Sequence, residues 1–108
     1  MTHEQLLDSY ARLAIKSGLN LQHGQQLLIT APLDAVPLVR RITEHAYRAG
    51  ASLVTTVYAD DETTLARYRH APEDTFDVAP AWLFNGMADA FRGGAARLAI
   101  AGENPALL

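Results

Sequence analysis

Residues 25–31 read QQLLITA and residues 52–58 read SLVTTVY. Both are short apolar runs between polar or turn-forming flanks, and the second is rich in β-branched residues, which is typical of buried strands. Between them, apolar side chains recur at helical spacing over residues 36–47, and Gly50 is the expected end of that helix. A strand, a helix and a second strand in this order predict two parallel strands joined by a right-handed crossover.

Signals on the amino-terminal side extend this unit. Thr2 and Gln5 have the spacing of a capping box, which predicts a helix that runs to a left-handed cap at Gly18. Asp34 is expected to cap the central helix by accepting a hydrogen bond from the Val36 amide. The central helix should lay an apolar stripe on the sheet; its members are Val36, Val39, Ile42 and Ala46.

The carboxyl-terminal half continues the alternation. We expect a short helix from residue 60 to residue 69, an irregular segment over 72–80, a helix from Pro80 to the glycines at 93–94, and a third strand over 95–101. Residues 102–105 are then a turn, and residues 106–108 begin a helix that is not completed. The prediction is an α/β fold, a three-layer domain with a mostly parallel sheet in the order α-β-α-β-α-α-β, apparently truncated.

The amino-acid composition argues against several classes of protein. The chain has 108 residues, 49% hydrophobic, with a net charge of -3, which suits one folded domain rather than a disordered chain. With 9 basic and 12 acidic residues we expect no nucleic-acid partner, and no apolar run approaches a membrane span. The absence of cysteine excludes disulfides and thiolate metal sites, and the amino terminus lacks a signal-peptide pattern, so a cytoplasmic location is expected.

Ligands of open α/β sheets bind beyond the carboxyl ends of the strands, which points to the loops at 30–34, 58–63 and 101–105. The first loop lacks the glycines of a dinucleotide or phosphate loop, so a nucleotide site is disfavoured. The only acidic cluster is Asp60, Asp61 and Glu62. We interpret it as a helix cap rather than a metal site, because no histidine lies at a supporting spacing.

Other reactive residue types form no recognisable catalytic pattern. The histidines (His3, His23, His45 and His70), the serines (Ser9, Ser17 and Ser52) and the arginines Arg67, Arg69 and Arg92 are widely separated or lie on solvated helix faces. A His70 and Glu73 pair could bind a metal, although a surface hydrogen bond is the commoner arrangement. An apolar stripe of Trp82, Phe84, Met87 and Phe91 belongs either to the core or to an interface. We assign no catalytic, cofactor-binding or metal-ligating residue.

One stretch near the amino terminus resembles the sequence of a known protein family. Residues 10–25 read YARLAIKSGLNLQHGQ and lead into the strand at 27–29. This resembles the amino-terminal opening of the thermophilic metalloaminopeptidases, the family of aminopeptidase T and aminopeptidase S. Further stretches match in order: residues 46–51, residues 60–62 with Arg67 and Tyr68, and residues 71–73 followed by Phe76, Trp82 and Leu83. The resemblance spans essentially the whole chain but only the beginning of the family's polypeptide.

The resemblance implies a cytoplasmic, dimeric exopeptidase that removes N-terminal residues from peptides with two divalent metal ions, such as cobalt, zinc or magnesium. In this family the metal ligands lie in a later domain, and no position here matches their motifs. Residues 1–108 would then be an incomplete N-terminal accessory domain, inactive alone, that meets peptide substrate through a catalytic domain absent from this chain. We also expect a homo-oligomer, because such a segment leaves apolar surface uncovered.

Two alternatives stay open. The chain could be a stand-alone α/β binding or assembly module without peptidase activity, or a small-ligand domain that uses the loop at residues 60–62. A coding frame that continues past Leu108 into a domain containing histidines and glutamates would favour the peptidase hypothesis. Protection by a ligand that is lost in Asp60→Ala would favour the small-ligand domain.

Overall fold

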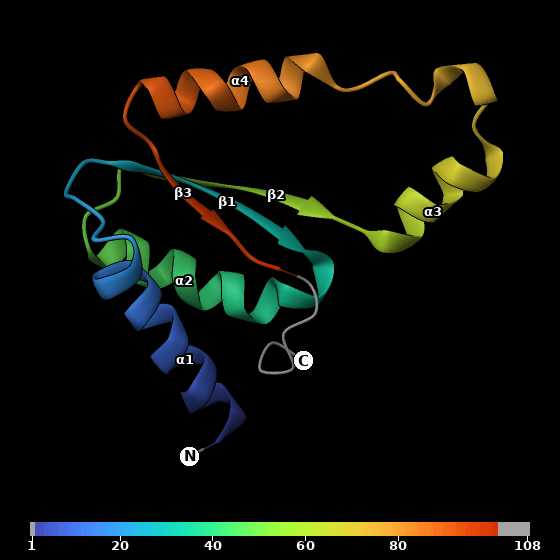
Figure 1. Cartoon of the computed structure of the whole chain (residues 1–108). Coiled ribbons are helices and arrows are strands. Elements are labelled where there is room, and N and C mark those ends of the chain that lie inside the picture. Colours follow the sequence, from blue (N-terminus) through green and yellow to red (C-terminus); the bar gives the residue numbers. More distant parts are fainter. Residues whose placement is uncertain (1, 102–108) are drawn as a thin grey trace.

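The computed structural model describes residues 2–101 and contains four α-helices and three strands in this part of the chain (Figure 1). They are α1 (His3–Leu13), β1 (Gln26–Pro32), α2 (Val36–Arg48), β2 (Leu53–Ala59), α3 (Asp61–His70), α4 (Ala81–Arg92) and β3 (Ala96–Ala99). A π turn covers Ala14–Gly18, and short 3-10 turns cover Leu33–Ala35 and Glu73–Thr75. The predicted order of helices and strands is confirmed.

The sheet has the strand order β2-β1-β3, and both pairings are parallel. In the register, Leu28 lies beside Thr55 of β2 and Arg97 of β3. Because side chains alternate along a strand, Leu27 and Ile29 face one side of the sheet and Leu28 faces the other. The third strand is shorter than predicted, although the Ile100 amide still donates to the Thr30 carbonyl at 2.9 Å.

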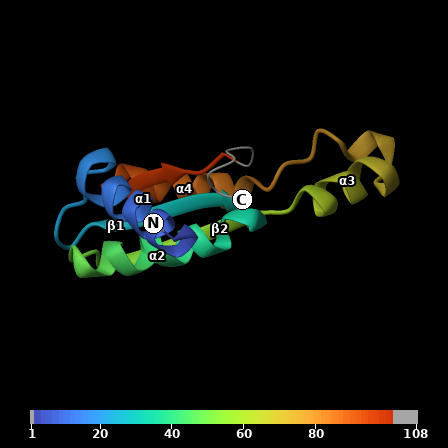
Figure 2. The same cartoon turned by 90° about the horizontal axis from the view of Figure 1, so that it is seen from below.

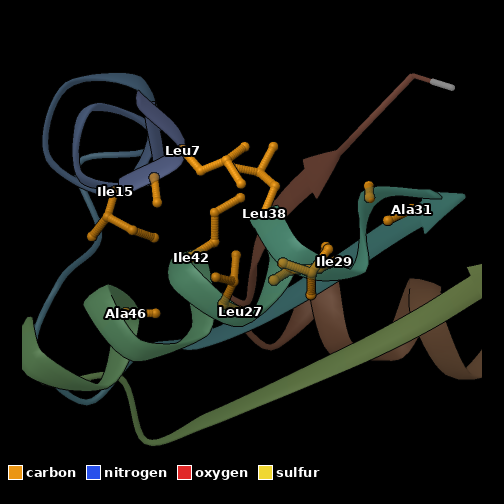
Figure 3. Packing of buried hydrophobic residues seen from close by; sticks show 11 residues of the cluster. Leu7, Ile15, Leu27, Ile29, Ala31, Leu38, Ile42 and Ala46 are labelled. Atoms are coloured by element: carbon orange, nitrogen blue, oxygen red, sulfur yellow. The ribbon is translucent and has the colours of Figure 1, made fainter. Parts of the chain in front are cut away.

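The core fills the side of the sheet that is covered by α1 and α2 (Figure 3). Its largest fully buried side chains are Leu27 and Ile29 from β1 and Ile42 from α2. On α2 the buried residues are Leu38, Val39, Ile42 and Ala46. Leu38 therefore replaces the predicted Val36, which is only half-buried. On the other side of the sheet lies α4, which completes the three layers (Figure 1).

Local sequence signals explain the start of α1 but not its end. The capping box is present: Gln5 donates its amide to the Thr2 hydroxyl at 3.1 Å, and Thr2 donates its amide to the Gln5 side chain at 2.9 Å. The left-handed cap predicted at Gly18 is wrong. The chain instead passes through the π turn, which carries Ile15 into the core, and the left-handed residue is Asn20 with a φ of 48°.

For α2, too, the sequence predicts one end of the helix correctly and the other end wrongly. The predicted Asp34 cap is wrong, because Asp34 lies inside the 3-10 turn that precedes the helix, and the cap position falls on Ala35, which is fully buried. Burial of Ala35 thus decides where the helix starts, and the capping preference of Asp34 does not. At the other end Gly50 has a φ of 97°, so the predicted termination at this glycine is confirmed.

Residues 60–80, which we name the arm, leave the carboxyl end of β2 and extend away from the sheet (Figure 2). Asp60 caps α3 by accepting from the Glu62 amide at 3.3 Å and from the Thr63 hydroxyl at 2.8 Å, as predicted. No residue of α3 is buried. The predicted turn at 102–105 and helix start at 106–108 lie outside the described residues.

Candidate functional site

The parallel strands of the sheet all end at one edge, and an open groove of about 690 Å³ lies there. Thr30 and Val57 from the strands and Leu83, Phe84 and Met87 from α4 line it, so its surface is mostly apolar. We name it the carboxyl-edge groove. Its position is the one at which open α/β sheets bind their ligands.

The structure brings together the loops that the sequence predicts for this edge. The groove is lined by Asp34 after β1, by Tyr58 near the end of β2, by Asp61 after β2, and by Ala101 after β3. The rest of the third loop, residues 102–105, lies outside the described part of the chain. Two acidic residues, Asp34 and Asp61, therefore border a mostly apolar groove.

The acidic cluster at residues 60–62 stabilises the start of α3. Asp60 is the cap of the helix, and Asp61 and Glu62 occupy its first turn, where negative charge is favourable at the positive end of the helix dipole. Between residues 2 and 101, no group of three or more histidine, aspartate or glutamate side chains is arranged to hold a metal ion. The residues that the structure describes therefore do not fit a two-metal centre.

The four histidines stay apart in the described structure. His45 Nε2 donates to Asp8 Oδ1 at 2.9 Å, which joins α2 to α1 on the side of the sheet away from α4. His23 lies against Gly50, His3 is the first residue of α1, and His70 is the last of α3. None of them lines the carboxyl-edge groove.

The contact between α1 and α2 is a charged cluster that sequence reasoning missed. Arg41 Nη1 lies 3.8 Å from Asp8 Oδ1, and Arg41 Nη2 lies 4.0 Å from Glu4 Oε2. The hydrogen bond from His45 holds the pKa of Asp8 below its ordinary value, and the positive charge of Arg41 acts in the same direction. The signal was available: two acidic residues four apart on one helix and two basic residues four apart on another are complementary faces.

Two of the three arginines that the sequence places on helix faces, Arg67 and Arg92, have partners within the chain. Arg67 Nη2 lies within hydrogen-bond distance of the carbonyls of Thr75 (3.2 Å), Phe76 (3.4 Å) and Val78 (2.8 Å). Arg67 therefore holds the second half of the arm against α3. Arg92 pairs with Asp89 one turn earlier on α4.

A smaller cavity of about 260 Å³ separates α4 from the sheet. Leu28 and Val57 form its floor, and Leu83, Met87 and Trp82 form its roof. Trp82 is 78% exposed and Phe84 is 52% exposed, whereas Met87 and Phe91 are half-buried. Because Trp82 and Phe84 are exposed, the stripe does not belong to a closed core of the described chain, and the alternative, an interface, stays a prediction.

The fold and the groove define an α/β domain with a three-stranded parallel sheet flanked by helices and an open groove at the carboxyl edge of the sheet. No described helix is long and apolar enough to cross a membrane. Residues 3–108 match the family model of the thermophilic metalloproteases, M29. The chain belongs to this family.

Similar proteins of known name are aminopeptidases. The chain is 54% identical over 102 residues to aminopeptidase T of Thermus thermophilus and 38% identical over 104 residues to aminopeptidase AmpS of Bacillus subtilis. These matches cover 94% and 96% of this chain but 25% of each relative. The chain thus spans about a quarter of the length of these aminopeptidases.

A solved structure extends the likeness to three dimensions. Wild-type AmpT from Thermus thermophilus superposes with a TM-score of 0.90 at 51% sequence identity. The match covers 99% of this chain and 27% of that one. It confirms the predicted α/β fold and the predicted resemblance to the N-terminal segment of the metalloaminopeptidases.

Proposed function

We propose that this chain is the N-terminal accessory domain of a metal-dependent aminopeptidase that removes N-terminal residues from peptides. The observation that carries the proposal is the agreement in fold and sequence with AmpT along 99% of the chain. The family is a metalloprotease family, and its named relatives are aminopeptidases. Two divalent ions, cobalt, zinc or magnesium, would be held by residues of the polypeptide beyond this stretch, because residues 2–101 do not fit a metal centre.

In this proposal the domain contributes shape rather than chemistry. Its carboxyl-edge groove is lined by Asp34 and Asp61 together with mostly apolar residues. Such a surface suits one wall of a space that encloses a peptide, because apolar side chains bind through burial and the carboxylates favour a cationic group. The peptide is thus the proposed substrate, and a cytoplasmic homodimer is the proposed assembly, as the family resemblance implies.

A graft tests the proposal. Residues 1–108 replace the matching quarter of Thermus thermophilus aminopeptidase T, and hydrolysis of a leucyl anilide is measured with cobalt, zinc or magnesium. The graft should hydrolyse the anilide, and the isolated 108-residue chain should not. Turnover by the isolated chain would contradict the accessory role, and a folded graft without activity would contradict the family function.

A stand-alone α/β binding or assembly module remains the alternative. It requires the isolated chain to be a stable protein with a ligand of its own. Thermal unfolding of the isolated chain with and without peptides distinguishes the two hypotheses. A melting temperature raised by peptide, together with an inactive graft, would favour the binding module.

A further inference from the structure

Several large apolar side chains of the arm and of the start of α4 are exposed. Six large side chains are between 41% and 78% exposed: Leu65, Tyr68, Phe76, Val78, Trp82 and Phe84. We name this set the arm surface. The only aromatic contact within it is between Tyr68 and Phe76, whose ring centroids are 5.9 Å apart. These six residues lie within twenty positions of the sequence, and a segment with so many exposed apolar side chains is typical of an interaction site.

Hydrogen bonds within the chain fix the conformation of the arm that carries this surface. Asp60 caps the amino end of α3, and Arg67 holds the carbonyls of residues 75, 76 and 78. Almost the whole chain, the arm included, superposes on AmpT, a polypeptide nearly four times as long. The arm therefore keeps this path in a protein in which much additional polypeptide is present.

The position at which the chain leaves the sheet indicates which polypeptide covers the arm surface. Ala101, the last described residue, lines the carboxyl-edge groove, and Phe84 of the arm surface lines the same groove. We propose that the arm surface is the docking site for the polypeptide that follows this stretch in M29 proteins. A tethered segment that starts at the groove has an effective concentration in the millimolar range, whereas a second copy must associate from dilute solution.

Charge specifies the partner surface further. Between residues 60 and 80 there are six carboxylates and two arginines. The docking polypeptide should therefore present an apolar centre, to receive the ring of Trp82 or Tyr68, within a rim of lysine and arginine. This inference rests on the proposed function, since it places the catalytic polypeptide against the arm.

Photo-crosslinking in the grafted aminopeptidase tests the inference. p-Benzoyl-phenylalanine replaces Tyr68 in one variant and Phe84 in a second, so that a folding failure of one leaves the other. The matched control is Tyr10→p-benzoyl-phenylalanine, because Tyr10 is 44% exposed on α1, on the opposite side of the sheet from α4. After irradiation, denaturing gels and peptide mapping identify the partner of each crosslink.

Positions 68 and 84 should crosslink within one polypeptide, without a doubling of mass, to peptides that follow the graft. Their yield should be at least tenfold above that at position 10. Crosslinks that double the mass would assign the surface to a second copy, and yields equal to the control would show that nothing covers it; either result overturns the inference. Anilide hydrolysis by the Tyr68 variant, whose substituted residue does not line the carboxyl-edge groove, separates failure of the docking from failure of the proposed function.

Discussion

His45 Nε2 donates a hydrogen bond to Asp8 Oδ1 across 2.9 Å, and this contact joins two helices whose partner residues are 37 positions apart. The His45 side chain is 14% exposed and the Asp8 side chain is 33% exposed. Arg41 approaches the same carboxylate from one turn away on α2. The relationship couples the packing of α1 on α2 to the ionisation of a single aspartate.

Acid should therefore weaken the chain through Asp8. The pKa of Asp8 is lower in the folded state than its ordinary value of 3.8, so its stabilising effect is complete above that value and is lost as the pH falls through the folded pKa. Asp8→Asn should be less stable than the natural chain at pH 6, and the difference should shrink toward pH 2. Urea unfolding midpoints across this range measure it.

The control for this experiment is Glu44→Gln, which removes a carboxylate that pairs within α2, with Arg48, rather than with α1. It should lower the midpoint by less than Asp8→Asn at pH 6. A constant difference between Asp8→Asn and the natural chain at every pH would contradict the assignment to Asp8.

Sequence patterns predict most of the fold here because its local and tertiary signals agree. The capping box of Thr2 and Gln5 and the glycine at position 50 act through nearby backbone atoms, so their outcome can be predicted from a few residues. Gly18 and Asp34 fail for the opposite reason. The turns beside them are set by burial of Ile15 and Ala35, which depends on contacts with distant residues.

The candidate site, like the fold, is only partly predictable from the sequence. Its place at the carboxyl edge follows from parallel strands, and the loops at 30–34 and 58–63 do meet there. The exposure of Trp82 could not be predicted, because an apolar stripe on a helix has the same sequence whether it enters a core or faces a partner. The α1–α2 charged cluster was accessible in principle but required the pairing of two helices to be known.

Ile29 should be among the most sensitive positions for stability. It is fully buried between the sheet and the helices that cover it, so Ile29→Ala leaves a cavity and should cost about 3 kcal/mol of unfolding free energy. Leu65→Ala on the arm removes a side chain that is 42% exposed and should cost less than about 0.5 kcal/mol. Urea unfolding compares the two variants; equal losses would show that the core lies elsewhere.

Gly50 is constrained twice, by its backbone and by His23. Its φ is 97°, and a Cβ placed there would lie 2.4 Å from the Cδ2 atom of His23. Gly94 has a φ of 96° but no atom within 4 Å of the same position. Gly94→Ala should therefore cost about 1 kcal/mol for strain alone, and Gly50→Ala should cost more.

A double-mutant comparison isolates the steric part. In the background of His23→Ala, the unfolding free energy lost through Gly50→Ala should fall toward that lost through Gly94→Ala, because the imidazole contacts are removed and the backbone strain remains with one contact of 3.3 Å to the Cα atom of residue 23. Thermal or urea unfolding of the four variants gives the values. If removal of the imidazole changes nothing, the chain has relieved the clash by moving His23 aside.

Arg67 should control the order of the arm without affecting the core. Its Nη2 atom lies close to three backbone carbonyls, and a lysine ammonium has neither the planar fork nor the reach to replace the guanidinium. Arg67→Lys should therefore open residues 72–80 to thermolysin, which cleaves before apolar residues such as Phe76 and Val78. We expect cleavage there to be about tenfold faster, which corresponds to about 1.4 kcal/mol of local opening free energy.

The matched control is Arg69→Lys, two positions further along α3, which keeps the charge of the arm and leaves the carbonyl contacts of Arg67 in place. Its cleavage rate should equal that of the natural chain, and the urea midpoint of both variants should stay unchanged, because no residue of α3 belongs to the core. If Arg67→Lys instead lowers the urea midpoint as much as a core substitution does, the arm and the sheet unfold as one unit, and the arm surface is not a separable docking element.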